Sequence, residues 1–165
     1  MTRITVEDGA GPAGHPAGRD EVWAGLLAFN EAHSGPGSFT SRPLSVLLRD
    51  EDGAVLGGLV GRSYSGWLYV ELFHLPEAHR GGGTGRAVLR AAEAEALARG
   101  CIGVRLETYS FQAPGFYARM GYSVVGELRD CPPGHTRFSL AKRLDGAPPG
   151  KAESGEEKKG SACST

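Results

Sequence analysis

Cysteine, long apolar runs and an excess of charge of either sign are all scarce in this sequence of 165 residues. The three cysteines include no C-x-x-C pair, which argues against a disulfide framework and a thiolate metal site. No run of about 18 apolar residues is present to span a membrane, and the first residues contain no apolar signal-peptide core. A formal net charge of -1 provides no positive field to hold a nucleic acid. These absences predict a cytoplasmic protein that binds no membrane, no nucleic acid and no metal.

The composition divides the chain into one folded domain, residues 1–144, and a C-terminal tail, residues 145–165. The length suits a single domain with one hydrophobic core. The tail contains no large apolar side chain, so its burial cannot repay the entropy of becoming ordered. We therefore predict a disordered tail.

Hydrophobic periodicity predicts an α+β domain with a mixed, mostly antiparallel sheet. The expected strands cover residues 4–6, 44–50, 54–64, 67–75, 102–108, 122–128 and 136–144. The expected helices are 21–33, capped by Asp20 and carrying the apolar stripe Val22, Trp23, Leu26, Leu27 and Phe29; 86–99, with Val88, Leu89, Ala92, Ala96 and Leu97 inward; and a short helix from Pro114 to Met120. The second helix joins strands 67–75 and 102–108 in a right-handed βαβ unit, which makes these two strands parallel.

A glycine-rich segment, residues 79–86, lies where the strand at 67–75 leads into the longest helix. Free backbone N–H groups and the positive end of the helix dipole meet at such a place, and glycines let consecutive amides turn toward one anion. Arg80 and Arg86 add cationic donors, so the segment predicts phosphate binding. A P-loop is excluded because no Lys-Ser or Lys-Thr follows the glycines. A dinucleotide fingerprint lacks its third glycine, but Glu107 stands about 20 residues downstream as a ribose ligand would, so NAD stays an alternative.

Two motifs resemble those of the GNAT N-acetyltransferases. Residues 80–85, RGGGTG, match the pyrophosphate motif R-x-x-G-x-G, and residues 114–122, PGFYARMGY, contain the segment F-Y-x-x-x-G-[FY]. Roughly residues 40–144 follow the family pattern. The resemblance implies a GNAT-like mixed sheet with a splayed parallel strand pair and flanking helices.

It also implies a function. Acetyl-CoA would be the co-substrate, and its acetyl group would pass by direct attack in a ternary complex to a primary amine of a small molecule, such as an antibiotic or a polyamine-like amine. A non-catalytic module of the same fold that binds CoA or an amine ligand is the alternative. A homodimer is a further expectation.

The resemblance assigns the cofactor site. The pantetheine arm would pair with the strand backbone of Phe73, His74 and Leu75, where an amide near His74 or Leu75 would also hold the oxyanion. The pyrophosphate would be held by Arg80, Gly81, Gly82, Gly83, Thr84, Gly85 and Arg86.

Two side chains are predicted to move protons. Tyr117 matches the motif tyrosine that protonates the departing thiolate in many relatives. Glu71 is the expected general base, because a carboxylate inside an apolar strand is costly unless it has a task or a partner; pairing with a basic neighbour is the competing interpretation. His74 is the second choice of base, on the opposite strand face by alternation.

The acceptor pocket is implied to lie between the first helix, the strand at 67–75 and the turn between the last two strands. The candidate residues are Phe29, His33, Phe39, Trp67, Tyr69 and Arg129. These aromatic side chains suit an amine through cation–π contact, while Trp67 and Tyr69 equally suit strand packing. Many relatives carry an asparagine before the tyrosine helix that is absent here, and Ser110 or Gln112 could replace it.

Overall fold

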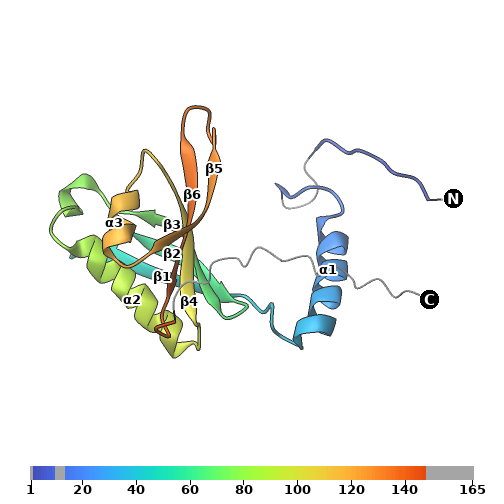
Figure 1. Cartoon of the computed structure of the whole chain (residues 1–165), viewed down its shortest axis with the longest axis horizontal. Coiled ribbons are helices and arrows are strands. Elements are labelled where there is room, and N and C mark those ends of the chain that lie inside the picture. The colour runs from blue at the N-terminus through green and yellow to red at the C-terminus, as the bar shows by residue number, and fades with distance from the viewer. Residues whose placement is uncertain (1, 10–13, 148–165) are drawn as a thin grey trace, which may run out of the picture.

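The computed structural model describes residues 2–9 and 14–147 and is built around a six-stranded sheet in the order β1-β2-β3-β4-β6-β5 (Figure 1). The strands are β1 (Arg42–Arg49), β2 (Val55–Tyr64), β3 (Trp67–His74), β4 (Gly103–Tyr109), β5 (Ser123–Arg129) and β6 (Thr136–Arg143). The helices are α1 (Arg19–Ser34), α2 (Thr84–Ala98), α3 (Pro114–Arg119) and the short 3-10 helix η2 (Glu77–His79). All neighbouring strands are antiparallel except β3 and β4, so the predicted mixed sheet is confirmed.

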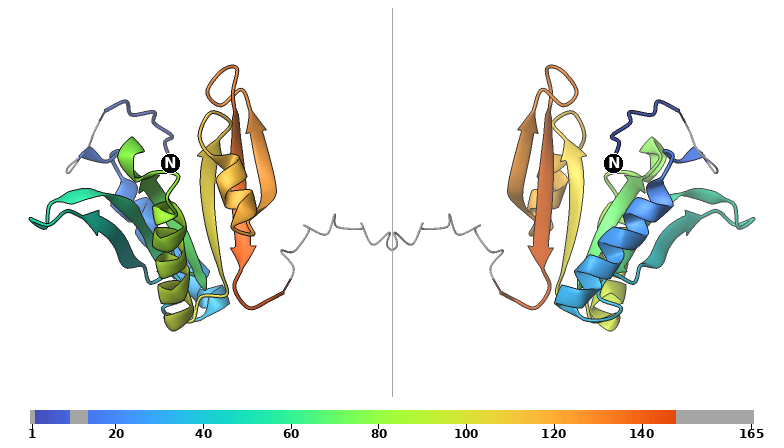
Figure 2. Two further views of the ribbon diagram at one scale, coloured as in Figure 1. Left: turned by 90° about the vertical axis from the view of Figure 1, so that its left-hand side faces the viewer. Right: turned by 90° about the vertical axis from the view of Figure 1, so that its right-hand side faces the viewer.

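The parallel pair β3 and β4 separates partway along its length. Pairing joins residues 67–70 to residues 103–106, although both strands continue beyond these positions. On the other side of β3, Val60 lies opposite Leu72 while Gly61 lies opposite Val70, which leaves Glu71 as the extra residue of a β-bulge. A bulge bends its strand. The β1–β3 half therefore diverges from the β4–β6 half, as Figure 2 shows, and the predicted splayed pair is confirmed.

Helix α2 covers one face of the sheet and supplies much of the core. Its predicted inward residues Val88, Leu89, Ala92 and Ala96 are all buried, whereas Leu97 is 51% exposed and was assigned wrongly. Glu93 is buried instead. The stripe of this helix is thus shifted around its axis relative to the sequence prediction.

The buried Glu93 is stabilised by two partners from the far half of the sheet. The Tyr122 hydroxyl donates a hydrogen bond of 3.0 Å to its carboxylate, and the Lys142 ammonium lies 2.8 Å from it. A buried carboxylate is tolerated only when it is paired and hydrogen-bonded in this way. The network fastens α2 to the β5–β6 side of the opening.

Helix α1 stands apart from the sheet (Figure 1). None of its residues is buried, and Val22, Trp23, Leu26 and Phe29 are 45% to 72% exposed. Gly18 rather than Asp20 occupies the N-cap position, because the left-handed φ of 70° at the helix start suits glycine.

The predicted strand at residues 4–6 is wrong. Residues 2–9 form no strand, and Ile4 and Val6 are exposed, since no sheet edge lies beside them to supply hydrogen-bond partners. Most of the predicted tail, residues 148–165, lies outside the described residues. Among the helices that the structure does describe, none is long and apolar enough to cross a membrane.

Candidate active site

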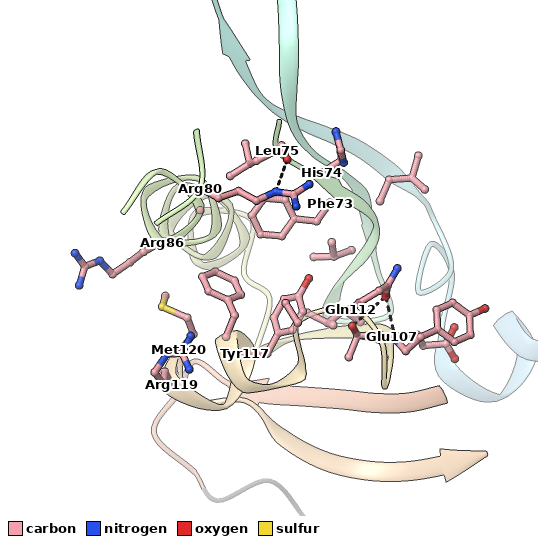
Figure 3. A pocket seen from close by; sticks show the side chains of 18 of the residues that line it. Phe73, His74, Leu75, Arg80, Arg86, Glu107, Gln112, Tyr117, Arg119 and Met120 are labelled. Carbon is pink, nitrogen blue, oxygen red and sulfur yellow. Dashed lines mark hydrogen bonds between the residues drawn. The ribbon is translucent and has the colours of Figure 1, made fainter. Parts of the chain in front are cut away.

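A cleft of about 1380 Å³ occupies the opening between the diverging ends of β3 and β4 (Figure 3). Its walls are the last part of β3 with Leu75 after it, the glycine loop (residues 80–86) apart from Thr84, the end of β4 with the loop after it, and α3. Ligand pockets usually measure about 300–1,000 Å³, so this cleft can hold a ligand larger than most.

The β3 wall offers unpaired backbone. Parallel pairing with β4 ends at Val70, so the peptide groups of Phe73 and His74 that face the cleft have no strand partner among the described residues. An extended ligand arm can bond to such groups as an added strand does. The carbonyl of Leu75 is already used, because it accepts a hydrogen bond of 2.8 Å from the Arg80 guanidinium, drawn in Figure 3.

The glycine loop leads directly into an uncapped helix. Gly83 is the N-cap residue of α2 with φ of 93°, a conformation that favours glycine, and no side chain caps the helix. The first amides of α2 therefore keep free N–H groups at the positive end of the helix dipole. Such a helix start binds anions.

The predicted cofactor residues meet at this end of the cleft, with one exception. Phe73, His74, Leu75, Arg80, Gly81, Gly82, Gly83, Gly85 and Arg86 all border the cleft. Thr84 faces the adjoining outer surface, beside Arg90. Arg80 also has a structural task, because its bond to Leu75 ties the loop to the end of β3.

Tyr117 extends from α3 toward β3 (Figure 3). Pro114 starts this helix at a position where the missing N–H costs nothing. The ring of Tyr117 is packed against Phe116 and Tyr122, with centroids 5.2 and 5.9 Å away, and only 8% of the residue is exposed. Burial raises the pKa of the Tyr117 phenol to about 12, so the group keeps its proton at neutral pH. It can therefore donate that proton but not act as a base.

Glu71 and His74 both border the cleft, although strand alternation predicted opposite faces. The alternation fails because the β-bulge inserts Glu71 as an extra residue. The carboxylate of Glu71 lies 3.1 Å from Nε of Arg62, and its side chain is 32% exposed. The basic neighbour weighed in the sequence analysis is thus present, and Glu71 also faces the open cleft.

The predicted acceptor residues are scattered. Tyr69 borders the cleft, while Trp67 lies at the far end of β3 with the Arg143 guanidinium 5.8 Å from its ring. Phe29 and His33 stack on each other along α1, with ring centroids 4.4 Å apart, and neither lines the cleft. The cleft lining also lacks Phe39 and Arg129. The structure therefore brings only Tyr69 of this set to the site.

The end of β4, the loop after it and Arg137 of β6 form the opposite wall, and Tyr109, Phe111 and Arg137 were missed as site residues from the sequence. Tyr109 and Phe111 stack in parallel with centroids 5.2 Å apart, and Arg137 forms an ion pair with Glu107 beside them. The sequence signal was weak, because a Tyr at the end of a strand and a Phe in the following loop resemble ordinary packing residues.

Gln112 organises the turn at the end of β4. Its side-chain oxygen accepts hydrogen bonds from the Tyr109 amide at 2.9 Å and from the Thr108 hydroxyl at 3.1 Å. Ser110 Oγ accepts a bond of 3.2 Å from the Thr136 amide, which ties the same turn to β6. Both residues considered as replacements for the missing asparagine therefore hold this loop in shape.

The sequence of the chain is similar to those of known proteins. The model of the acetyltransferase (GNAT) family matches residues 13–122. Acetyltransferase Atu2258 of Agrobacterium fabrum is 40% identical over 119 residues, which cover 72% of this chain and 85% of that protein. Blasticidin-S acetyltransferase of Streptomyces morookaense is 44% identical over 108 residues, which cover 63% of this chain and 79% of that protein.

The fold agrees with the sequence matches. A crystal structure of a protein from Agrobacterium tumefaciens has a TM-score of 0.76 at 34% identity and covers 87% of this chain and 100% of its own. The family match spans α1 to α3 and so includes the splayed strands, the glycine loop and the tyrosine helix that build the cleft. On these grounds the chain belongs to the acetyltransferase (GNAT) family.

Proposed function

We propose that the protein is an acetyl-CoA-dependent N-acetyltransferase that acts on a primary amine of a small molecule. The observation that carries this proposal is the cleft itself, which has an uncapped helix start at one end and the protonated phenol of Tyr117 within it. The relationship to blasticidin-S acetyltransferase supports an antibiotic amine as acceptor. A polyamine-like amine is the second candidate from the sequence.

Acetyl-CoA fits the donors that the cleft presents. The free amides at the start of α2, together with Arg80, would hold the pyrophosphate, and the open backbone of Phe73 and His74 would bind the pantetheine arm. Acetyl-CoA supplies the activated thioester. The chain's own contribution is to align this thioester along β3 and to exclude water from it.

The reaction also requires that one proton be removed from the amine and another be given to the departing thiolate. An alkylammonium has a pKa near 10.4 and must lose a proton before its nitrogen attacks the thioester carbonyl. Glu71 borders the cleft and would accept that proton, while Arg62 fixes the carboxylate in place. As the carbon–sulfur bond breaks, the thiolate would take the proton of Tyr117, and the second proton, which the acetylated nitrogen releases, would return through solvent to the phenolate. Exclusion of water favours the proton transfer from phenol to thiolate, because desolvation raises the pKa of a thiol as well as that of a phenol and so makes the thiolate a stronger base.

The test is a screen for thiol release from acetyl-CoA with aminoglycoside-like, polyamine, nucleoside-antibiotic and amino-acid amines. We expect at least one amine to be acetylated on nitrogen, as identified by mass spectrometry. Tight CoA binding with no turnover on any amine would instead favour the non-catalytic module. Thermal stabilisation by NADH but not by acetyl-CoA would favour the dinucleotide alternative and overturn the proposal.

A homodimer and a cytoplasmic location belong to the same proposal. The exposed apolar side chains of α1 support self-association, because a 16-residue helix is marginally stable in water without a packing partner. Light scattering on the purified protein at several concentrations measures the oligomeric state directly.

A further inference from the structure

A cluster of aromatic and charged side chains crosses three strands beside the cleft. Arg62, Tyr69 and Arg105 are direct cross-strand neighbours on β2, β3 and β4, so their side chains share one face of the sheet. Tyr64 completes the cluster, because the Arg105 guanidinium lies over its ring and donates a hydrogen bond to its hydroxyl. Tyr69 connects this cluster to the cleft that it borders.

Arg105 is held firmly but has no counter-charge. Its guanidinium carbon lies 4.4 Å from the ring centroid of Tyr69 and 5.4 Å from that of Tyr64. No carboxylate in the described part of the chain forms an ion pair with it. The two other arginines nearby differ, since Arg62 pairs with Glu71 and Arg137 pairs with Glu107.

The local charge balance therefore favours an anion. The region contains three arginines and two glutamates, and both glutamates already form ion pairs, with Arg62 and Arg137. A guanidinium held over the ring of Tyr69 and hydrogen-bonded to the Tyr64 hydroxyl keeps its remaining donors oriented, so little side-chain entropy is lost when a carboxylate binds to it. Planar donors of this kind match the two oxygens of a carboxylate.

We propose that Arg105 binds a carboxylate of the acceptor, so that the substrates of this enzyme carry an anionic group in addition to the acetylated amine. This inference rests on the proposed function above. Adjacent strands are about 4.8 Å apart and two residues along a strand span about 6.7 Å, which places the backbones of Arg105 and Glu71 roughly 8 Å apart. A zwitterionic amine of amino-acid size or somewhat larger spans this distance. Polycationic amines bind poorly there, because the excess positive charge repels them.

The experiment compares each acceptor amine as its free acid and as its primary amide. For the wild-type protein we expect kcat/KM to be at least tenfold higher for the acid. Arg105→Gln keeps a polar side chain but removes the charge, and we expect it to abolish the preference through a higher KM for the acid. The KM for the amide and for acetyl-CoA stays unchanged. Arg105→Lys retains part of the preference because it retains the charge.

Arg143→Gln is the matched control. Arg143 also lies over an aromatic ring of the sheet, that of Trp67, but it pairs with Asp145, and Trp67, unlike Tyr69, does not border the cleft. This variant should keep the wild-type preference. Equal use of acids and amides by the wild-type protein, or an equal loss of both in Arg105→Gln, overturns the inference alone. Failure to acetylate any amine in either form overturns the proposed function with it.

Discussion

Removing one oxygen atom from Tyr117 should lower catalysis while leaving the stability of the protein nearly unchanged. The phenol oxygen forms no hydrogen bond with the described residues, and the ring alone makes the contacts with Phe116 and Tyr122. Tyr117→Phe should therefore change the free energy of unfolding by less than about 0.5 kcal/mol. Loss of a general acid typically lowers the rate 10²–10⁴-fold, equivalent to about 3–5 kcal/mol in the activation barrier.

Tyr122→Phe provides the opposite pattern at the neighbouring ring. Its hydroxyl donates a 3.0 Å hydrogen bond to the buried carboxylate of Glu93 and does not border the cleft. A hydrogen bond to a charged group contributes about 1.5–3 kcal/mol to stability. Tyr122→Phe should lose roughly this amount of unfolding free energy while the remaining folded enzyme keeps its kcat.

The measurement pairs denaturant unfolding with thiol release under saturating acetyl-CoA. We expect Tyr117→Phe to match the wild-type protein in stability and in acetyl-CoA affinity but to lose kcat. The reverse is expected for Tyr122→Phe. Full kcat in Tyr117→Phe, or a stability loss there that exceeds the one in Tyr122→Phe, would refute the role of Tyr117 as the acid.

Three further predictions concern the glycine loop, the base and pH. Gly85→Val places a branched side chain in the cleft and should weaken acetyl-CoA binding at least tenfold by calorimetry. Gly115→Ala, in the first turn of α3 and outside the cleft lining, should leave the affinity unchanged. Equal affinities of the two variants would contradict pyrophosphate binding by the glycine loop. Glu71→Gln should lower kcat/KM at neutral pH and regain it as the pH approaches about 10.4, where the amine loses its proton unaided; a constant deficit would count against a base. Since the folded pKa of Tyr117 is raised to about 12, the wild-type protein should lose about 2 kcal/mol of unfolding free energy relative to Tyr117→Phe as the pH rises from 10 to 12, and a flat difference would contradict the shift.

Local sequence patterns predicted most elements of this fold because each pattern has a local cause. The alternation in residues 102–108 and the stop of the helix before Gly100 depend on neighbours in the chain, and β4 and α2 appear close to where they were expected. The burial of Glu93 could not be foreseen in this way. Its partners Tyr122 and Lys142 are distant in sequence and meet it only in the folded sheet.

The candidate site was predictable where motifs mark it and not where strand register decides it. Residues 80–86 and Tyr117 were found from motifs and do line the cleft apart from Thr84. The bulge at Glu71 has no sequence signature, so the relation of Glu71 to His74 was misjudged. Arg105 was overlooked because its isolation from carboxylates is a property of three assembled strands.

The separation of β3 from β4 has a consequence for the life of the protein in a cell. It places an exposed strand edge within the body of the sheet, and exposed edges are templates on which other chains can add β-structure. The pantetheine arm that we propose for this position would cover the exposed edge of β3 and block the addition of another chain. Resistance to aggregation should then increase with the concentration of coenzyme A. In a cell that is short of coenzyme A, more of the protein would have an exposed strand edge and be prone to aggregate.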